Sequence, residues 1–134
     1  MNEVKKGIRG RLTAATALTA LLSGTAAVYH GLAPSGATLP YVVFTLISDE
    51  ELNLTPRRER ECVVDIKAIS ADEDMAGTIA ARIEEAMETD INVTGYGVVW
   101  QRRDRAISLR EVTDGKVYYH AGHTYRIRIQ KLGG

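Results

Sequence analysis

The segment Val28–Ser48 constrains the fold more than any other part of the chain. Within it, a loop rich in glycine and proline, residues 31–40, leads directly into residues 41–47, which are apolar at nearly every position. Proline lacks the amide donor that the interior of a strand needs, and an unbroken apolar run is typical of a strand covered on both faces. The segment therefore predicts an irregular loop followed by a buried strand.

Two segments have the periodicity of amphipathic helices. Residues 2–23 place apolar side chains three or four positions apart and basic side chains on another face, and Ser23-Gly24 is a suitable stop. We expect this helix to pack against a core; a helix lying on a membrane surface is the alternative. The second helix is expected to begin at Ser70, because residues 70–73 have the form of a capping box. Its apolar face consists of Met75, Ile79, Ile83 and Met87.

The remaining segments have the pattern of strands. Residues 61–69 alternate between apolar and polar positions, which places Cys62 in the core as a small buried residue. Residues 96–103 and 117–131 predict two further strands, and Asp114-Gly115 favours a tight hairpin turn before the last one. The order is helix, strand, strand, helix, strand, strand. It predicts a single α+β domain over residues 1–134, an antiparallel sheet with two helices packed on one face.

Residues 48–60 interrupt the strand pattern with charged side chains and Pro56. We interpret them as a long polar hairpin loop in which the carboxylates of residues 49–51 are solvated. In an assembly, such a loop has room to reach a neighbouring subunit or another protein. The candidate contact residues at its end are Arg57, Arg58, Glu59 and Arg60.

The total charge is balanced, with 17 Lys and Arg against 17 Asp and Glu, which excludes a uniformly basic DNA-binding surface. The distribution is uneven, since residues 71–90 are mostly acidic and residues 101–131 mostly basic. These segments are either two solvated faces or a subunit contact, in which the acidic helix of one copy meets the basic strands of the next and a ring closes. The candidate interface residues are Glu84, Glu85, Arg126 and Arg128.

The sequence contains no catalytic motif, and Cys62 is its only cysteine, so no internal disulfide can form. His120 and His123 face opposite ways in an extended strand, which favours surface histidines; a bulge at Gly122 would favour the metal-site alternative. We predict no catalytic, cofactor-binding or metal-binding residue. No apolar stretch approaches the roughly 20 residues that span a bilayer, and no secretory signal is evident, so we expect the chain to be made and folded in the cytoplasm.

Several local phrases of the sequence resemble one protein family. They are the LTALLSG end of the first helix, Val28-Tyr29 followed by Ala33-Pro34 and LPYVVF, the strand ECVVDIKAIS leading into an Ala-rich helix, and the final strand at residues 125–129. Together they cover most of the chain. They resemble the tail terminator, or tail completion, proteins of long-tailed bacteriophages, including their prophage and gene transfer agent versions.

The resemblance implies a structural virion protein and no enzyme. It implies a homohexameric ring at the head-proximal end of the tail, made in the host bacterial cytoplasm, which terminates tube polymerisation. The expected partners are the tail tube protein and the head–tail connector protein, with DNA passing through the ring without sequence-specific binding. No cofactor and no membrane are implied. The alternatives are another head–tail joining or head-completion protein, or a small cytoplasmic binding or assembly module.

Overall fold

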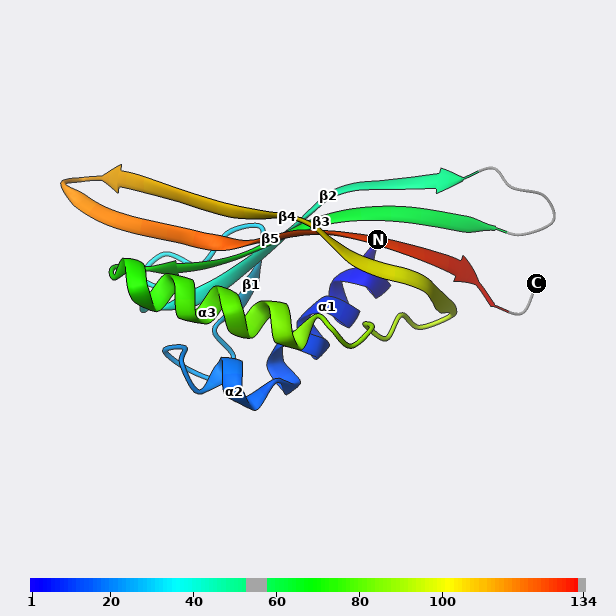
Figure 1. The fold of residues 1–134 in the computed structure, drawn as a ribbon, viewed down its shortest axis with the longest axis horizontal. Coiled ribbons are helices and arrows are strands. Elements are labelled where there is room, and N and C mark those ends of the chain that lie inside the picture. Colours follow the sequence, from blue (N-terminus) through cyan, green and yellow to red (C-terminus); the bar gives the residue numbers. More distant parts are fainter. Residues whose placement is uncertain (53–57, 133–134) are drawn as a thin grey trace.

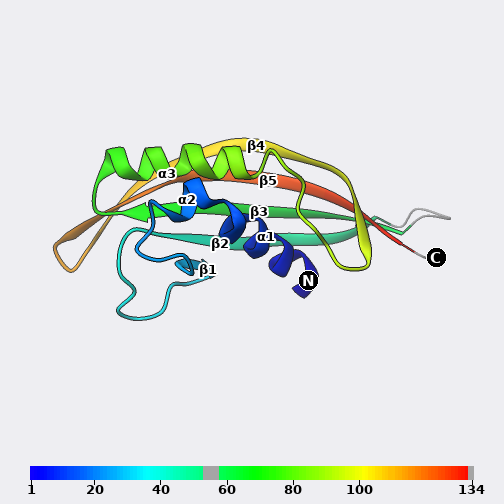
Figure 2. The same cartoon turned by 90° about the horizontal axis from the view of Figure 1, so that it is seen from below.

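The computed structural model describes residues 1–52 and 58–132. In chain order, its elements are α1 (Asn2–Ala14), α2 (Thr16–Thr19), β1 (Val28–His30), β2 (Tyr41–Leu52), β3 (Glu59–Ser70), α3 (Glu73–Ala86), β4 (Tyr96–Thr113) and β5 (Lys116–Lys131). Figure 1 shows a layer of strands with the helices below it. In Figure 2, which is seen from below, the helices lie in front of the strands. The predicted α+β class is confirmed, with the helices on one face of the sheet.

The strands form one sheet in the order β1-β2-β3-β5-β4. Three of its four pairings are antiparallel, as predicted, but β1 runs parallel to β2, with Val28 opposite Val42. The sequence-based order did not contain β1, because a strand of three residues within an irregular segment has no detectable alternation. The central pair β3 and β5 is in register from Glu59 opposite Gln130 to Ser70 opposite Tyr119.

The prediction of one helix over residues 2–23 is wrong. The helix breaks at Ala15, whose backbone is extended at φ −82° and ψ 93°, so that α1 and the short α2 follow each other at an angle. Threonines around the break are β-branched and poor helix formers, and the Thr13 hydroxyl bonds the Arg9 carbonyl at 2.8 Å. The break allows Leu18 to be fully buried in the core.

The start of the second helix also differs from the prediction. Ser70 is the last residue of β3, and Asp72 is the N-cap of α3, accepting a hydrogen bond from the Met75 amide at 3.3 Å. The Ser70 hydroxyl accepts from the Asp72 amide at 3.1 Å, which orients the chain between strand and helix. An Asp side chain caps a helix as well as Ser does, so the capping signal was correct in kind and displaced by two residues.

The described residues of the predicted loop at 48–60 are mostly strand, and residues 53–57 lie outside the described part of the chain. β2 continues to Leu52 and β3 begins at Glu59, and these two residues are paired. The prediction that residues 49–51 are solvated is wrong for Asp49, which accepts two hydrogen bonds from Arg60, at 2.8 and 2.9 Å. This cross-strand ion pair holds the hairpin together where the sequence pattern is polar throughout.

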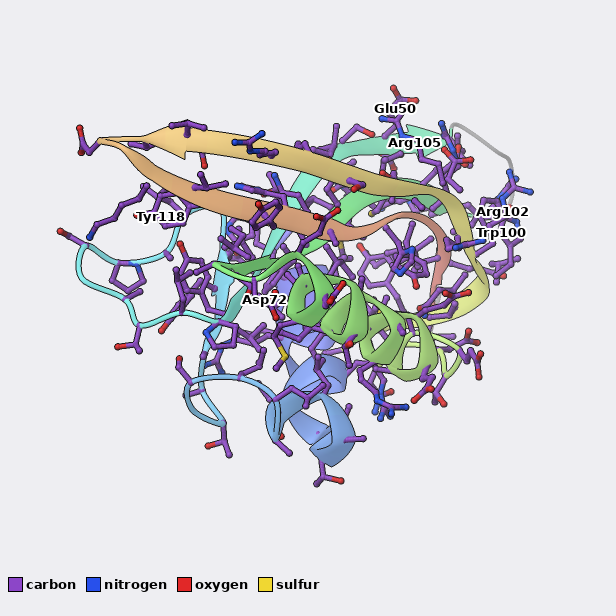
Figure 3. All side chains as sticks on the ribbon, turned by 60° about the vertical axis from the view of Figure 1, so that its left-hand side comes forward. Glu50, Asp72, Trp100, Arg102, Arg105 and Tyr118 are labelled. Atoms are coloured by element: carbon purple, nitrogen blue, oxygen red, sulfur yellow. The ribbon has the colours of Figure 1, made fainter. Side chains whose placement is uncertain are left out.

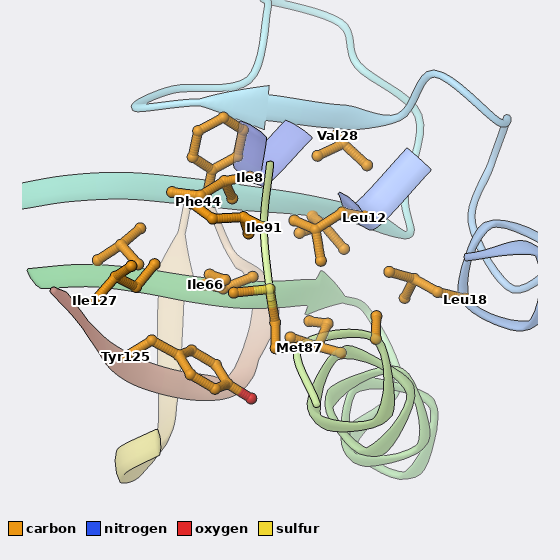
Figure 4. Packing of buried hydrophobic residues seen from close by; sticks show 14 of the residues in the cluster. Ile8, Leu12, Leu18, Val28, Phe44, Ile66, Met87, Ile91, Tyr125 and Ile127 are labelled. Atoms are coloured by element: carbon orange, nitrogen blue, oxygen red, sulfur yellow. The ribbon is translucent and has the colours of Figure 1, made fainter. Parts of the chain in front are cut away.

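The core lies between the sheet and the helices, as the close view in Figure 4 shows. Strands β2, β3 and β5 contribute Phe44, Ile66 and Ile127, each with at most 1 % of its surface exposed. Their partners from the helical layer are Ile8, Leu12, Leu18, Ile79 and Ile83. Cys62 is fully buried, as predicted, and this burial raises the pKa of its thiol to about 12.

Two glycines of contrasting surroundings test the packing of the sheet. A Cβ on Gly122 in β5 would collide with the backbone of β3 at the Ile66 carbonyl and the Lys67 Cα, whereas a Cβ on Gly77 in α3 would meet nothing within 4 Å. We expect Gly122→Ala to lower the free energy of unfolding by about 1–3 kcal/mol or more, since backbone must move. Gly77→Ala should raise it by up to about 1 kcal/mol. Urea unfolding of both variants measures this, and an unchanged midpoint for Gly122→Ala would contradict the close approach of the two strands.

The ion pair of Asp49 predicts a pH dependence of stability. Burial raises the pKa of Asp49, but the hydrogen bonds and charge of Arg60, together with the N-terminal amine of Met1 at 3.5 Å, outweigh it and leave that pKa below its ordinary value. A lowered carboxyl pKa stabilises the fold above the unfolded-state pKa of about 4, and this contribution disappears as the pH falls through the folded-state pKa. Asp49→Asn should therefore cost about 1–2 kcal/mol at pH 7 and almost nothing at pH 2.

The exposed neighbour Glu50 supplies the control for this measurement. Glu50→Gln removes the same charge from the same strand without removing an ion pair among the described residues, so its effect should be within about 0.5 kcal/mol at both pH values. Equal effects of the two variants at pH 7, measured by urea unfolding, would show that the Asp49–Arg60 pair does not stabilise the hairpin.

Candidate assembly surfaces

One face of the sheet is left uncovered by the helices of the described chain (Figure 1). At the end of the sheet near the β2–β3 hairpin, this face carries ion pairs between neighbouring strands. Arg128 on β5 donates to the carboxylate of Glu59 on β3 at 2.9 Å. Arg126 lies 3.3 Å from Asp104 on β4 and 3.8 Å from Glu61 on β3. The face is therefore charged but internally balanced.

The structure does not bring the candidate contact residues of the predicted loop together on one surface. Arg57 lies outside the described residues, and Arg58 is exposed, 3.9 Å from Glu51. Glu59 and Arg60 belong to β3, so their assignment to a loop was wrong. They point to opposite faces of the sheet: Glu59, only 2 % exposed, meets Arg128 on the uncovered face, while Arg60 meets Asp49 on the helical side.

The two acidic candidates near the end of α3, Glu84 and Glu85, have partners in their own chain. Glu84 lies 3.7 Å from Arg103 on β4 and 3.9 Å from the His123 ring. Glu85 pairs with Arg82 one turn earlier in the helix at 2.8 Å. These pairs are half exposed and add little stability individually. They show that Glu84 and Glu85 have partners before any second copy is present.

The four predicted interface residues lie on two sides of the molecule. Glu84 and Glu85 are on α3, below the sheet, and Arg126 and Arg128 point to the uncovered face. They cannot meet within one chain, so a contact between them requires two copies. That contact remains a prediction, and it would have to compete with the ion pairs that each residue makes already.

The sheet has two incompletely paired edges, which sequence reasoning did not identify. β4 lies at one end of the sheet and pairs with β5 on one side only. At the other end, β1 pairs with residues 42–44 of β2, so residues 45–52 extend past it. The β2 edge contains one bulge, at Ile47, and β4 contains two, at Val99 and Asp104; the Ile47 and Val99 side chains are 55 % and 46 % exposed. The sequence signal that could have indicated these edges was an exposed apolar residue close to a charged run: Ile47 before residues 49–51 and Val99 before residues 102–105.

The histidines were predicted to lie on the surface, and this is wrong. His123 is 5 % exposed, and its Nε2 donates to the Ala80 carbonyl of α3 at 2.9 Å. His120 is mostly buried on the other face, with Nε2 3.0 Å from Glu111. The prediction that the two rings face opposite ways is confirmed by these partners. The part of the chain that the structure describes contains no group of three or more His, Cys, Asp or Glu side chains that could hold a metal ion.

The hollows of the surface are open grooves. A groove of about 1060 Å³ runs between α3 and the β4–β5 hairpin, lined among others by Asp74, Arg82, Arg110 and His120. A smaller one, of about 400 Å³, lies on the uncovered face beside Tyr41. These grooves combine charges with small and aromatic side chains. Ser108 and His120 both line the larger one, but among the described residues no hydrogen bond joins Ser108 to a histidine or a carboxylate, and His120 bonds Glu111 instead. Among the described residues, no helix has the length and apolar character that crossing a membrane requires.

Comparison with known proteins shows which fold and which family this chain resembles. The chain is similar in fold to a protein of the virion of a native gene transfer agent particle, with a TM-score of 0.74 at 20 % sequence identity, over 95 % of this chain and 94 % of that one. No curated protein matches the chain. The family described as tail completion protein gp17 matches residues 6–130, nearly the whole chain. The chain therefore belongs to the tail completion protein gp17 family, a family of virion tail proteins.

Proposed function

We propose that this protein forms a homohexameric ring that caps the head-proximal end of a tail tube, terminates tube polymerisation and joins the tail to the head connector. The observation that carries the proposal is the family match over residues 6–130. The similarity in fold to a gene transfer agent virion protein over nearly the full length of both chains supports it. The role is structural and requires no cofactor.

The shape of the subunit suits a joint between two different partners. The β2–β3 hairpin and the β4–β5 hairpin project from opposite ends of the molecule (Figure 1). A ring built from such subunits presents one set of hairpins on each side, and the two sets differ in sequence. One side then contacts the tail tube protein and the other the connector protein. In this proposed ring we place the uncovered face toward the channel, where its near balance of charge suits passage of DNA without tight or sequence-specific binding.

Polymerisation of the purified tail tube protein tests the capping role. With this chain present, we expect tubes to stop growing and to carry one ring at a single end, because a cap that binds the last ring blocks the next addition. Electron microscopy measures tube lengths and locates the ring. Tubes of unchanged length and bare ends would contradict the proposal. Binding to the connector alone would identify the protein as a different head–tail joining protein.

The hairpin at the β2–β3 end is the proposed contact with the tube. Arg58 is exposed there and its only described ion pair, with Glu51, is long at 3.9 Å. Arg58→Glu should leave the fold intact and weaken binding to tube ends by about two- to fivefold, since one exposed charge pair is worth at most about 1 kcal/mol. The matched control is Lys116→Glu at the tip of the β4–β5 hairpin. If Lys116→Glu weakens tube binding and Arg58→Glu does not, the β4–β5 end faces the tube.

A further inference from the structure

We propose that neighbouring subunits join edge to edge, with β4 of one copy pairing with residues 45–52 of β2 in the next, so that one continuous sheet runs around the ring. The inference rests on the proposed ring and names the surface that builds it. Its first support is that both edges are long and that the described structure pairs each on one side only. Exposed, unpaired strand edges are templates for a further strand.

Strand direction supports the same pairing. From β2 through β3 and β5 to β4, each strand is antiparallel to its neighbour, so β2 and β4 run in opposite directions. A second copy placed beside the first by a rotation about the ring axis presents its β2 to β4 in the antiparallel sense. The alternation therefore continues across the boundary, and the uncovered faces of both copies remain on the same side. A contact of this kind uses two different surfaces, and it closes into a ring when the rotation between copies divides the full circle.

The register across the sheet brings opposite charges together at the boundary. On the uncovered face, one row of partners runs from Glu50 through Glu61 and Arg128 to Trp100. The next row on the same face runs from Ser48 to Arg102. Without a shift between copies, Glu50 of one subunit lies beside Trp100 of the next and diagonal to Arg102. Arg102 already stacks on the Trp100 ring, 4.6 Å from its centre. Figure 3 shows these side chains together with Arg105.

The two edges differ in charge as a pair of complementary surfaces would. The β2 segment carries Asp49, Glu50 and Glu51, and β4 carries Arg102, Arg103 and Arg105 against Asp104. Among the described residues, Glu50 and Arg105 make no ion pair, in contrast to Glu84 and Arg126, which would have to exchange existing partners to form an interface. Complementary charge at an interface sets register and partner choice.

Apolar exposure concentrates on the same two edges. Of the six large apolar side chains that are exposed in the described chain, four lie on them. They are Ile47, Val99, Leu109 and Val112. Natural sheets usually protect their edges with short strands or with charges that repel a partner, and an edge strand of 18 residues is long by that standard. Pairing in this register would cover Ile47 and Val99 and satisfy the backbone groups around them, whereas Leu109, which shares a row with Tyr41, and Val112 lie beyond residues 45–52.

Cysteine cross-linking tests the pairing directly. Ser48 and Arg102 share a row across the sheet, yet lie three strand spacings apart within one chain, about 14 Å, which is beyond the reach of a disulfide. Under oxidation, Ser48→Cys with Arg102→Cys in one chain should give a covalent ladder up to ring size on non-reducing gels. Glu50→Cys with Arg102→Cys covers a register shifted by two residues. Each single variant should give no ladder, and the buried Cys62 thiol, with its pKa near 12, should stay silent.

A separate cysteine pair tests the competing interface, in which the acidic helix of one copy meets the basic strands of the next. Glu85→Cys with Arg126→Cys joins the acidic helix to the uncovered face of the next copy, and we expect no ladder from it.

Charge reversal is a second test of the edge contact, and it does not depend on the register. Arg102→Glu with Arg105→Glu should raise the concentration of half-assembly at low salt about tenfold, and adding Glu50→Lys should restore part of the loss.

The outcomes separate this inference from the proposed function. A ladder from an edge pair, together with weakened assembly of the Arg102/Arg105 variant, supports the edge-to-edge sheet. A ladder from the helix pair alone overturns it and leaves the ring standing. Normal assembly of the charge-reversed variant, with no ladder from either edge pair, also overturns it. If the wild-type chain stays monomeric by light scattering, free and with tube ends present, both the inference and the proposed ring fail.

Discussion

The close pairing of β3 with β5 is the contact on which the rest of the structure depends. Gly122 lets the β5 backbone lie directly against Ile66 and Lys67, where any side chain would collide. From this seam, Ile66 and Ile127 face down into the core, and His123 reaches the Ala80 carbonyl of α3. The seam therefore sets both the register of the sheet and the position of the helical layer beneath it.

The consequences extend outward along the strands. Because the helices cover only the middle of one face, the outer parts of β2 and β4 are supported by cross-strand pairs such as Asp49 with Arg60. Such ribbons have little hydrophobic burial of their own and expose long edges. A monomeric enzyme would have little use for them, whereas a subunit that must contact neighbours, a tube and a connector needs several separate surfaces. This is the physical reason for placing function on the edges and hairpin tips.

Local sequence patterns predicted the elements whose signals are local. The alternation from Cys62 to Ala68 and the apolar stripe of the second helix are short-range features. The alternation is buried as expected, and so are Ile79, Ile83 and Met87 of the stripe, while Met75 is partly buried. The errors arose where long-range contacts decide. Strand extends to Leu52 and resumes at Glu59 in a polar segment because Asp49 meets Arg60 across it, and His123 is buried because α3 supplies a carbonyl acceptor. The edges could not be identified because strand order is set by tertiary pairing, which no local pattern reports.

The central claim is that copies of this chain form a closed ring at the end of a virion tail. A reconstruction of that end of the particle by electron cryomicroscopy tests it most directly. The account predicts a single six-membered ring of this fold at the head-proximal end of the tube, with strands continuing from β4 of each copy into β2 of the next. Finding the fold elsewhere in the particle, or as separate copies without a closed ring, would contradict it.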